Sequence, residues 1–356
     1  MNALKNIGIP ATDRAGPSCA VTPRQDRSSR PSACTLDDVL TAKHPSNFRD
    51  ALNAEGTGPI ILDGGLGTHL ADRGNDVTGE LWSAQILMDR PDEVRAAHQD
   101  FFAAGAQVAT TCSYQVSRDG LEQAGSAGQF ETMLRTSVAL AKEAATDDAQ
   151  DSSRWVAASV GPYGAGPGAG TEYDGAYDLD AAELAQWHRE RLAILAGTGA
   201  DVIIFETVPS MAEVEALTLL AKDLELPAIL SVNVRADERG QIVLGDGTDL
   251  RVAAKLVAES GVWAGVGVNC CPVPQAVAAL RILGEETGLP LSAYPNSGET
   301  WDHEARVWVP GTEGNDLPSA VPELIAAGAR LIGGCCQVSP EQITRVREAA
   351  RAVAGN

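Results

Sequence analysis

The 356-residue sequence has few basic and few aromatic residues. Lys and Arg number 27 against 48 Asp and Glu, so the formal net charge is −21, and aromatic residues make up 4% of the chain. A field of this sign repels phosphate groups, so we expect neither nucleic acid nor a membrane surface as a partner. No run of about 18 apolar residues, the length of a transmembrane helix, occurs, and the N-terminus lacks the apolar stretch of a secretory signal. We therefore expect a cytoplasmic protein.

Several motifs of common chemistries are also missing. No G-x-G-x-x-G fingerprint and no Gly-Lys dipeptide occurs, which counts against dinucleotide binding of the usual kind and removes the P-loop. No H-x-H or H-E-x-x-H spacing occurs either, which disfavours a zinc hydrolase with histidine ligands. Cysteine is better represented. Seven are present, an odd number that does not suit a disulfide scaffold, and four of them form the adjacent pairs Cys270-Cys271 and Cys335-Cys336.

Residues 1–46 differ in composition from the rest. The stretch RQDRSSRPSAC is rich in Arg, Ser and Pro and has no hydrophobic period, so we expect a disordered N-terminal tail. A transit-type leader has a similar composition, but Asp13, Asp26, Asp37 and Asp38 count against it. No linker-like stretch divides residues 47–356, which favours one domain there.

Short apolar runs alternate with helical patterns after the tail. Helical stretches such as DEVRAAHQDFFAAGA and VPQAVAALRILGEETG have apolar residues three and four apart and end near a glycine. Runs this apolar suit strands of a parallel sheet that is buried on both faces. The expected strands are Pro59–Asp63, Gln107–Cys112, Trp155–Val160, Asp201–Glu206, Ala228–Val234, Gly265–Cys270, Leu291–Asn296 and Ala329–Gly334. Eight strands that each precede a helix predict an α/β fold of the (β/α)₈ TIM-barrel type, with a doubly wound open sheet as the alternative.

In such barrels the chemistry lies at the carboxyl ends of the strands. The sixth and eighth expected strands end in cysteine, so Cys270, Cys335 and Cys336 could meet there, and three thiolates suit Zn²⁺. Three protein ligands with one open position are typical of a catalytic zinc site. The glycines before Cys335 would let the backbone turn so that both sulfurs face one metal. The alternative is that these cysteines are buried small hydrophobes.

Two acidic residues end other expected strands, Asp63 the first and Glu206 the fourth. Each alone could be an ordinary helix cap or a paired structural acid. Together at one end of a barrel they suit a substrate ammonium group.

Residues from the first strand to the eighth resemble the zinc-dependent homocysteine S-methyltransferase family. The GVNC and GGCC segments are the specific part of this resemblance. The matching segments are Leu62-Asp63-Gly64-Gly65, Leu81-Trp82-Ser83, Thr111-Cys112-Ser113-Tyr114-Gln115, Ser159-Val160-Gly161-Pro162-Tyr163-Gly164, Glu206-Thr207, Gly267-Val268-Asn269-Cys270, Tyr294-Pro295-Asn296-Ser297-Gly298-Glu299 and Gly333-Gly334-Cys335-Cys336.

The resemblance implies methyl transfer from S-methylmethionine or S-adenosylmethionine to the thiolate of L-homocysteine, giving methionine, with Cys270, Cys335 and Cys336 holding Zn²⁺. It further implies that Asp63 and Glu206 bind the homocysteine ammonium and that the amides near Gly64 and Gly65 bind its carboxylate. Candidates for the donor side are Tyr114, Asn296 and Glu299. A betaine-dependent enzyme and a non-catalytic zinc- or thiol-sensing barrel are the alternatives, and the sequence leaves the oligomeric state open.

Overall fold

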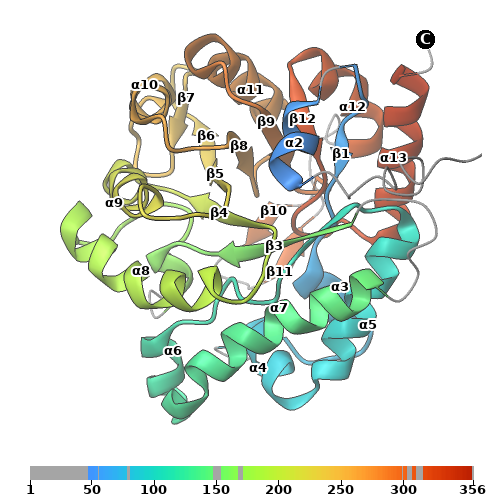
Figure 1. Ribbon diagram of the computed structural model, residues 1–356. Coiled ribbons are helices and arrows are strands. Elements are labelled where there is room, and N and C mark those ends of the chain that lie inside the picture. The colour runs from blue at the N-terminus through green and yellow to red at the C-terminus, as the bar shows by residue number, and fades with distance from the viewer. Residues whose placement is uncertain are drawn as a thin grey trace, which may run out of the picture. The chain divides into compact units, whose positions relative to one another are not determined.

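Eight parallel strands surrounded by helices form the centre of the computed structural model (Figure 1). The structure describes residues 47–54, 56–77, 81–146, 154–166, 171–298, 300–302, 307–309 and 316–354. The expected disordered tail, residues 1–46, lies outside the described residues. The strands are β1 (Ile60–Ile61), β2 (Val108–Thr110), β3 (Trp155–Val160), β4 (Val202–Val208), β5 (Ala228–Val232), β8 (Gly265–Asn269), β9 (Leu291–Tyr294) and β12 (Ala329–Ile332).

The order of these strands shows that the sheet turns back on itself. Neighbouring strands pair in parallel in the order β1-β12-β9-β8-β5-β4-β3-β2. A parallel bridge between Leu62 and Val108 then joins the two ends of the sheet, where the Asp63 amide donates to the Val108 carbonyl at 3.0 Å. An open doubly wound sheet would keep two unpaired edges. The expected (β/α)₈ barrel is therefore confirmed.

Helices occupy the outside of the barrel (Figure 1). The helical stretches expected from the sequence are all present, and α5, α10 and α11 each end at a glycine with positive φ. The helices are α2 (Phe48–Asn53), α3 (Leu66–Asp72), α4 (Trp82–Asp89), α5 (Pro91–Ala104), α6 (Arg118–Gln123), α7 (Phe130–Thr146), α8 (Ala181–Ala196), α9 (Met211–Ala221), α10 (Leu250–Ser260), α11 (Val273–Thr287), α12 (Leu317–Ala326) and α13 (Pro340–Ala354), with 3₁₀ turns at Ala127–Gln129 and Tyr163–Ala165.

Alternation along the strands divides the apolar residues between two cores. On β4, Val202 and Ile204 belong to the core inside the barrel, whereas Ile203 and Phe205 pack against the helices. Helix α2 contributes to the inner core, where the ring of Phe48 lies edge-on to Trp155 at 5.7 Å. Because Trp155 begins β3, α2 closes the amino-terminal end of the barrel and leaves the carboxyl end for the site.

Two antiparallel hairpins are present that the sequence did not reveal. They pair β6 (Val234–Ala236) with β7 (Ile242–Leu244), and β10 (Thr300–Asp302) with β11 (Val307–Val309). Strands of three residues are too short to show a hydrophobic period. The first hairpin begins inside the run Ala228–Val234 that we expected to be one strand.

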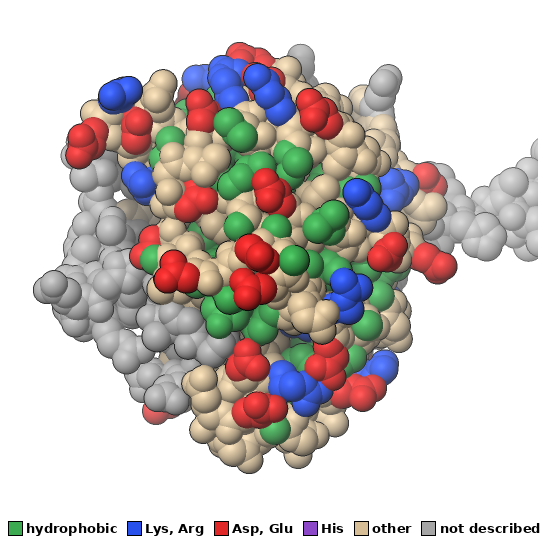
Figure 2. Space-filling view, turned by 90° about the vertical axis from the view of Figure 1, so that its left-hand side faces the viewer, with side chains coloured by type: hydrophobic (Ala, Val, Ile, Leu, Met, Phe, Trp, Pro, Cys, Tyr) green, Lys and Arg blue, Asp and Glu red, His purple; other side chains and the backbone are tan. Residues whose placement is uncertain are grey.

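Acidic side chains are spread over the one face that Figure 2 draws rather than gathered in one place on it. Figure 2 shows this on the face with α8, α9 and α10, where acidic and basic side chains are interspersed with apolar ones. No helix in the described part of the chain is long and apolar enough to cross a membrane.

Candidate functional site

A cavity of about 130 Å³ opens at the carboxyl ends of the strands. It is lined by segments that follow β1, β2, β8 and β12, by the ends of β4 and β9, and by the loop between β3 and α8. The lining residues are Gly64, Gly65, Leu66, Gly67, Thr68, Ser83, Thr110, Thr111, Cys112, Tyr114, Gln115, Glu172, Tyr173, Glu206, Thr207, Cys270, Tyr294, Gly334, Cys335 and Cys336.

Three cysteines, Cys270, Cys335 and Cys336, meet in this cavity and form what we call the cysteine triad. The Cys270 sulfur lies 2.7 Å from that of Cys335 and 3.6 Å from that of Cys336, and the last two sulfurs are 4.0 Å apart. All three are free thiols. The sulfurs are close enough to ligate one ion, so the triad could hold a metal.

Asn269, the last residue of β8, ties three strands together beneath the triad. Its side-chain oxygen accepts from the Thr207 amide and from the Ser231 hydroxyl, each at 2.8 Å. Its amide group donates to the Thr207 hydroxyl at 2.8 Å and lies 3.9 Å from the Cys335 sulfur. Because Asn269 is fully buried, these bonds fix the end of β8 and so the position of Cys270.

The backbone turn at the triad differs from the expected one. The positive φ angles belong to Cys270 (51°) and Gln337 (64°) rather than to Gly333 and Gly334. These two glycines instead allow close packing, because a Cβ on Gly333 would lie 2.5 Å from the Cβ of Leu62. A Cβ on Gly334 would lie 2.2 Å from the side chain of Val338. The glycines are thus required by the approach of β12 to the first strand and to the turn after the triad.

The protonation of the triad is uneven. Hydrogen bonds from Cys335 and Cys336 hold the pKa of Cys270 well below its ordinary value. The same hydrogen bonds to Cys270, together with burial and the negative charge at Cys270, raise the pKa values of Cys335 and Cys336 well above their ordinary value. Three thiolates this close need a cation, because like charges in a buried site disfavour each other's ionisation.

The other two described cysteines are isolated buried thiols. Burial raises the pKa of Cys112 to about 12, and its thiol donates to the Ser83 carbonyl at 3.4 Å. Burial also raises the pKa of Cys271, which packs in the outer core next to the barrel. Neither belongs to the triad.

The two acidic residues singled out in the sequence lie in different settings. Glu206 lines the cavity and accepts a hydrogen bond from the Ser159 hydroxyl. Asp63 is buried beside the cavity, and its two oxygens accept from the amide and the hydroxyl of Thr110, each at 2.7 Å. Burial raises the pKa of Asp63 to about 8 and that of Glu206 to about 7. A cationic ligand would favour the charged form of both.

The remaining candidates are placed as follows. Tyr114, Gly64 and Gly65 line the cavity, and the Gly65 amide donates to the Val338 carbonyl at 3.0 Å. Asn296 is absent from the described lining, and its backbone amide donates to the Cys271 carbonyl at 3.1 Å. Glu299 lies outside the described residues. The sequence reasoning missed Glu172 and Tyr173, which reach the cavity from a loop rather than from a strand end.

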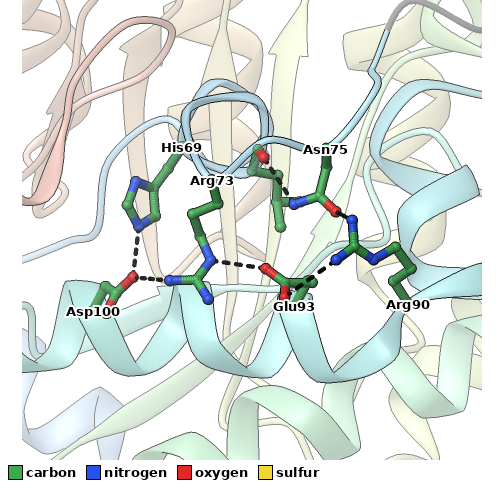
Figure 3. Close-up of polar contacts among 7 residues, drawn as sticks. His69, Arg73, Asn75, Arg90, Glu93 and Asp100 are labelled. Atoms are coloured by element: carbon green, nitrogen blue, oxygen red, sulfur yellow. Dashed lines mark hydrogen bonds and ion pairs between the residues drawn. The ribbon is translucent and has the colours of Figure 1, made fainter.

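Helix α3 forms part of the cavity wall, and polar side chains outside the cavity hold this helix in place. Leu66, Gly67 and Thr68 of this helix line the cavity. Figure 3 shows the polar network that joins α3 to α5, in which Asp100 accepts from His69 at 2.8 Å and from Arg73 at 2.7 Å. The labelled members of the network are His69, Arg73, Asn75, Arg90, Glu93 and Asp100.

A second buried network supports the wall on the side of α8. Arg191 of this helix donates to the Gly161 carbonyl at 2.7 Å and to the Tyr114 carbonyl at 3.5 Å. Its guanidinium also lies over the ring of Trp187, 4.6 Å from the centroid. Arg191 therefore fixes the backbone that carries the cavity residue Tyr114.

Known proteins resemble the chain over most of its length. The family model described as homocysteine S-methyltransferase matches residues 60–350. The homocysteine S-methyltransferase of Escherichia coli is 38% identical over 295 residues, which cover 81% of this chain and 94% of that protein. A selenocysteine Se-methyltransferase of Brassica oleracea is 37% identical over 311 residues, which cover 82% of this chain and 88% of that protein.

Solved structures agree with the sequence matches. The metallated form of the homocysteine methyltransferase MmuM from Escherichia coli aligns with a TM-score of 0.72 and 36% identity, over 82% of this chain and 96% of that structure. The oxidised form of the same protein aligns with a TM-score of 0.73. The chain therefore belongs to the homocysteine S-methyltransferase family.

Proposed function

We propose that the protein transfers a methyl group from a sulfonium donor to the thiolate of L-homocysteine, giving methionine, in a reaction that depends on zinc held by the cysteine triad. The preferred donor is S-methylmethionine, and S-adenosylmethionine reacts more slowly. The observation that carries this proposal is the meeting of three cysteine sulfurs with the buried carboxylate of Glu206 in one cavity of a family member.

The triad fits zinc in ligand type and in spacing. Sulfurs that share one tetrahedral zinc ion at about 2.3 Å lie about 3.8 Å from one another. Two of the three distances in the triad, 3.6 and 4.0 Å, are near this value, and the third is shorter at 2.7 Å. Three protein ligands leave a fourth position for the sulfur of a substrate.

The chemistry requires a thiolate at neutral pH. A bound zinc ion would lower the pKa of a coordinating homocysteine thiol and so keep it nucleophilic. Because the thiolate then exists before the donor arrives, no side chain needs to remove a proton during methyl transfer. This agrees with a cavity whose described lining contains no histidine.

The carboxylate of Glu206 suits the ammonium group of homocysteine because it is buried and lines the cavity. With the ammonium group bound, the charged form of Asp63 would add to the negative potential from beside it, although both of its oxygens already accept from Thr110. The Gly65 amide is bonded to Val338, which makes the Gly64 amide the better donor to the substrate carboxylate. Tyr114 remains a candidate for the donor side, together with Asn296 and Glu299.

One assay tests this function against its alternatives. Pure protein is mixed with zinc, homocysteine and a single donor, and methionine is quantified with S-methylmethionine, S-adenosylmethionine, betaine and methyltetrahydrofolate in turn. We expect turnover only with the two sulfonium donors. Turnover with betaine and with neither sulfonium would overturn the donor assignment. One bound zinc per chain without turnover from any donor would favour a sensing role.

A further inference from the structure

Glu172 is a cavity residue whose carboxylate is left incompletely bonded. It belongs to the loop between β3 and α8 and lines the cavity beside the triad. Its Oε2 atom is buried and has no hydrogen-bond partner among the described residues. Burial, together with the charge at Cys270, raises the pKa of Glu172 to about 7. A buried carboxylate of this kind needs either a proton or a cationic partner.

The loop that carries Glu172 is held closely against the barrel. A Cβ on Gly164 would lie 2.6 Å from the Glu172 amide nitrogen, and a Cβ on Gly245 would lie 2.1 Å from the Tyr173 carbonyl oxygen. Further along, the Tyr177 hydroxyl donates to the buried carboxylate of Glu213. The two glycines allow backbone contact on both sides of the loop, so Glu172 is placed by packing.

The surroundings of Glu172 suit a positive ligand. Three of the five tyrosines in the chain, Tyr114, Tyr173 and Tyr294, line the same cavity, and aromatic faces attract cations. No Lys or Arg is among the described lining residues, so none of them supplies a cationic partner for Glu172, and a positively charged ligand could take that place. The Tyr173 hydroxyl lies 3.8 Å from the Cys270 sulfur, which places this loop directly over the triad.

The two cavity carboxylates differ in depth. Glu206 lies within β4, two residues from its end, and is buried, whereas Glu172 is partly exposed on a loop. If homocysteine is held in the depth of the cavity with its sulfur at the triad, the methyl donor approaches from the open side, where Glu172 lies. We propose that Glu172 recognises the positive charge of the methyl donor and so makes the enzyme specific for cationic donors.

This inference rests on the proposed function. In the reaction the bond between the methyl carbon and the donor sulfur breaks, its electron pair stays on that sulfur, and the homocysteine thiolate forms a new bond to the methyl carbon. The donor's positive charge is lost on the way to the transition state. Glu172 therefore stabilises bound donor at least as much as the transition state, so its removal should raise KM for the donor without lowering kcat.

The test compares Glu172→Gln with Asp174→Asn, which removes an exposed charge two residues away. The donors are S-methylmethionine and trimethylsulfonium, which carries the charge without the amino-acid part. For Glu172→Gln we expect KM for both donors to rise roughly 30-fold, the lower range for a broken charge pair. We expect no fall in kcat, and unchanged KM for homocysteine and zinc content. Asp174→Asn should behave as wild type.

A neutral methylating agent separates charge recognition from a structural role. Methyl iodide should methylate enzyme-bound homocysteine at the same rate in wild type and in Glu172→Gln. An unchanged KM for both sulfonium donors, or an equal loss with methyl iodide, would overturn the inference. A raised KM for homocysteine would instead assign Glu172 to the acceptor. If the wild type itself uses no sulfonium donor, the proposed function fails before this comparison is made.

Discussion

The substitution Glu213→Gln tests the buried network behind the cavity. Glu213, on α9, is fully buried and accepts from the Tyr163 amide at 2.7 Å, from His188 Nε2 at 2.8 Å and from the Tyr177 hydroxyl. His188 Nδ1 lies 2.8 Å from Arg191 Nη2. Because a guanidinium can only donate, Nδ1 is the acceptor and the imidazole proton is on Nε2, directed at Glu213. Arg191 thus donates to His188, and His188 donates to the carboxylate of Glu213.

The substitution keeps the shape of the side chain but removes its charge. Burial lowers the pKa of Arg191 to about 10, and the charge of Glu213 opposes this effect. Without that charge the guanidinium is a buried cation whose nearest counter-charge is lost. Such a loss costs about 3–5 kcal/mol, which is a large part of the roughly 5–15 kcal/mol that stabilises a typical protein.

Urea unfolding, followed by tryptophan fluorescence, measures this cost. We expect Glu213→Gln to lower the unfolding midpoint strongly and to reduce activity, because Arg191 also holds the Tyr114 backbone. The matched control is Glu190→Gln on α8, which breaks an exposed pair with Arg118 and should cost less than about 1 kcal/mol. A Glu213→Gln protein within 1 kcal/mol of wild type would refute the reasoning about the buried charge.

Three further results are expected. Alanine at any member of the cysteine triad should remove zinc and activity, whereas Cys271→Ala should keep both. Metal analysis after purification under reducing conditions measures this, and zinc loss in Cys271→Ala would contradict the ligand assignment. Glu206→Gln should raise KM for homocysteine at normal zinc content by the equivalent of about 2–5 kcal/mol, and unchanged kinetics would exclude ammonium binding. Burial lowers the pKa of His98 from 6.5 to about 4, so the unfolded state binds a proton that the folded state excludes, and stability falls as pH drops from 6.5 to 4. Relative to wild type, His98→Leu should therefore gain about 3 kcal/mol over that interval, and a pH-independent difference in urea midpoints would contradict the burial argument.

The barrel could be predicted because its strands are buried on both faces. Trp155–Val160 has the same bounds in the sequence and in the structure, since apolar residues fill the whole strand. Elsewhere the apolar run is longer than the strand itself. At Pro59–Asp63, only Ile60–Ile61 forms a strand. The run continues there because Leu62 and Asp63 are buried for other reasons, one in the inner core and one beside the cavity.

The triad was predictable for a related reason. A cysteine that directly follows a barrel strand is placed by the strand itself, and Cys270 and Cys335 both lie one to three residues beyond a ladder. Asp63 follows the same rule after β1, whereas Glu206 lies within β4, two residues before that strand ends. The residues next to Asp63 and Glu206 in the sequence do not reveal which carboxylate oxygens stay available for a ligand. That depends on Thr110, which bonds Asp63, and on Ser159, which bonds Glu206, and each partner lies 47 residues away in the chain.

Glu172 could not be found by this rule. It follows no strand, and its loop reaches the cavity through contacts with Gly164 and Gly245, of which Gly245 is distant in the sequence. Acidic residues are common in this chain, so composition does not single one out. What distinguishes Glu172 is a buried oxygen without a partner in a cavity whose described lining has no basic residue. That combination depends on packing between segments that are distant in the sequence, and it singles out the residue that would select the donor.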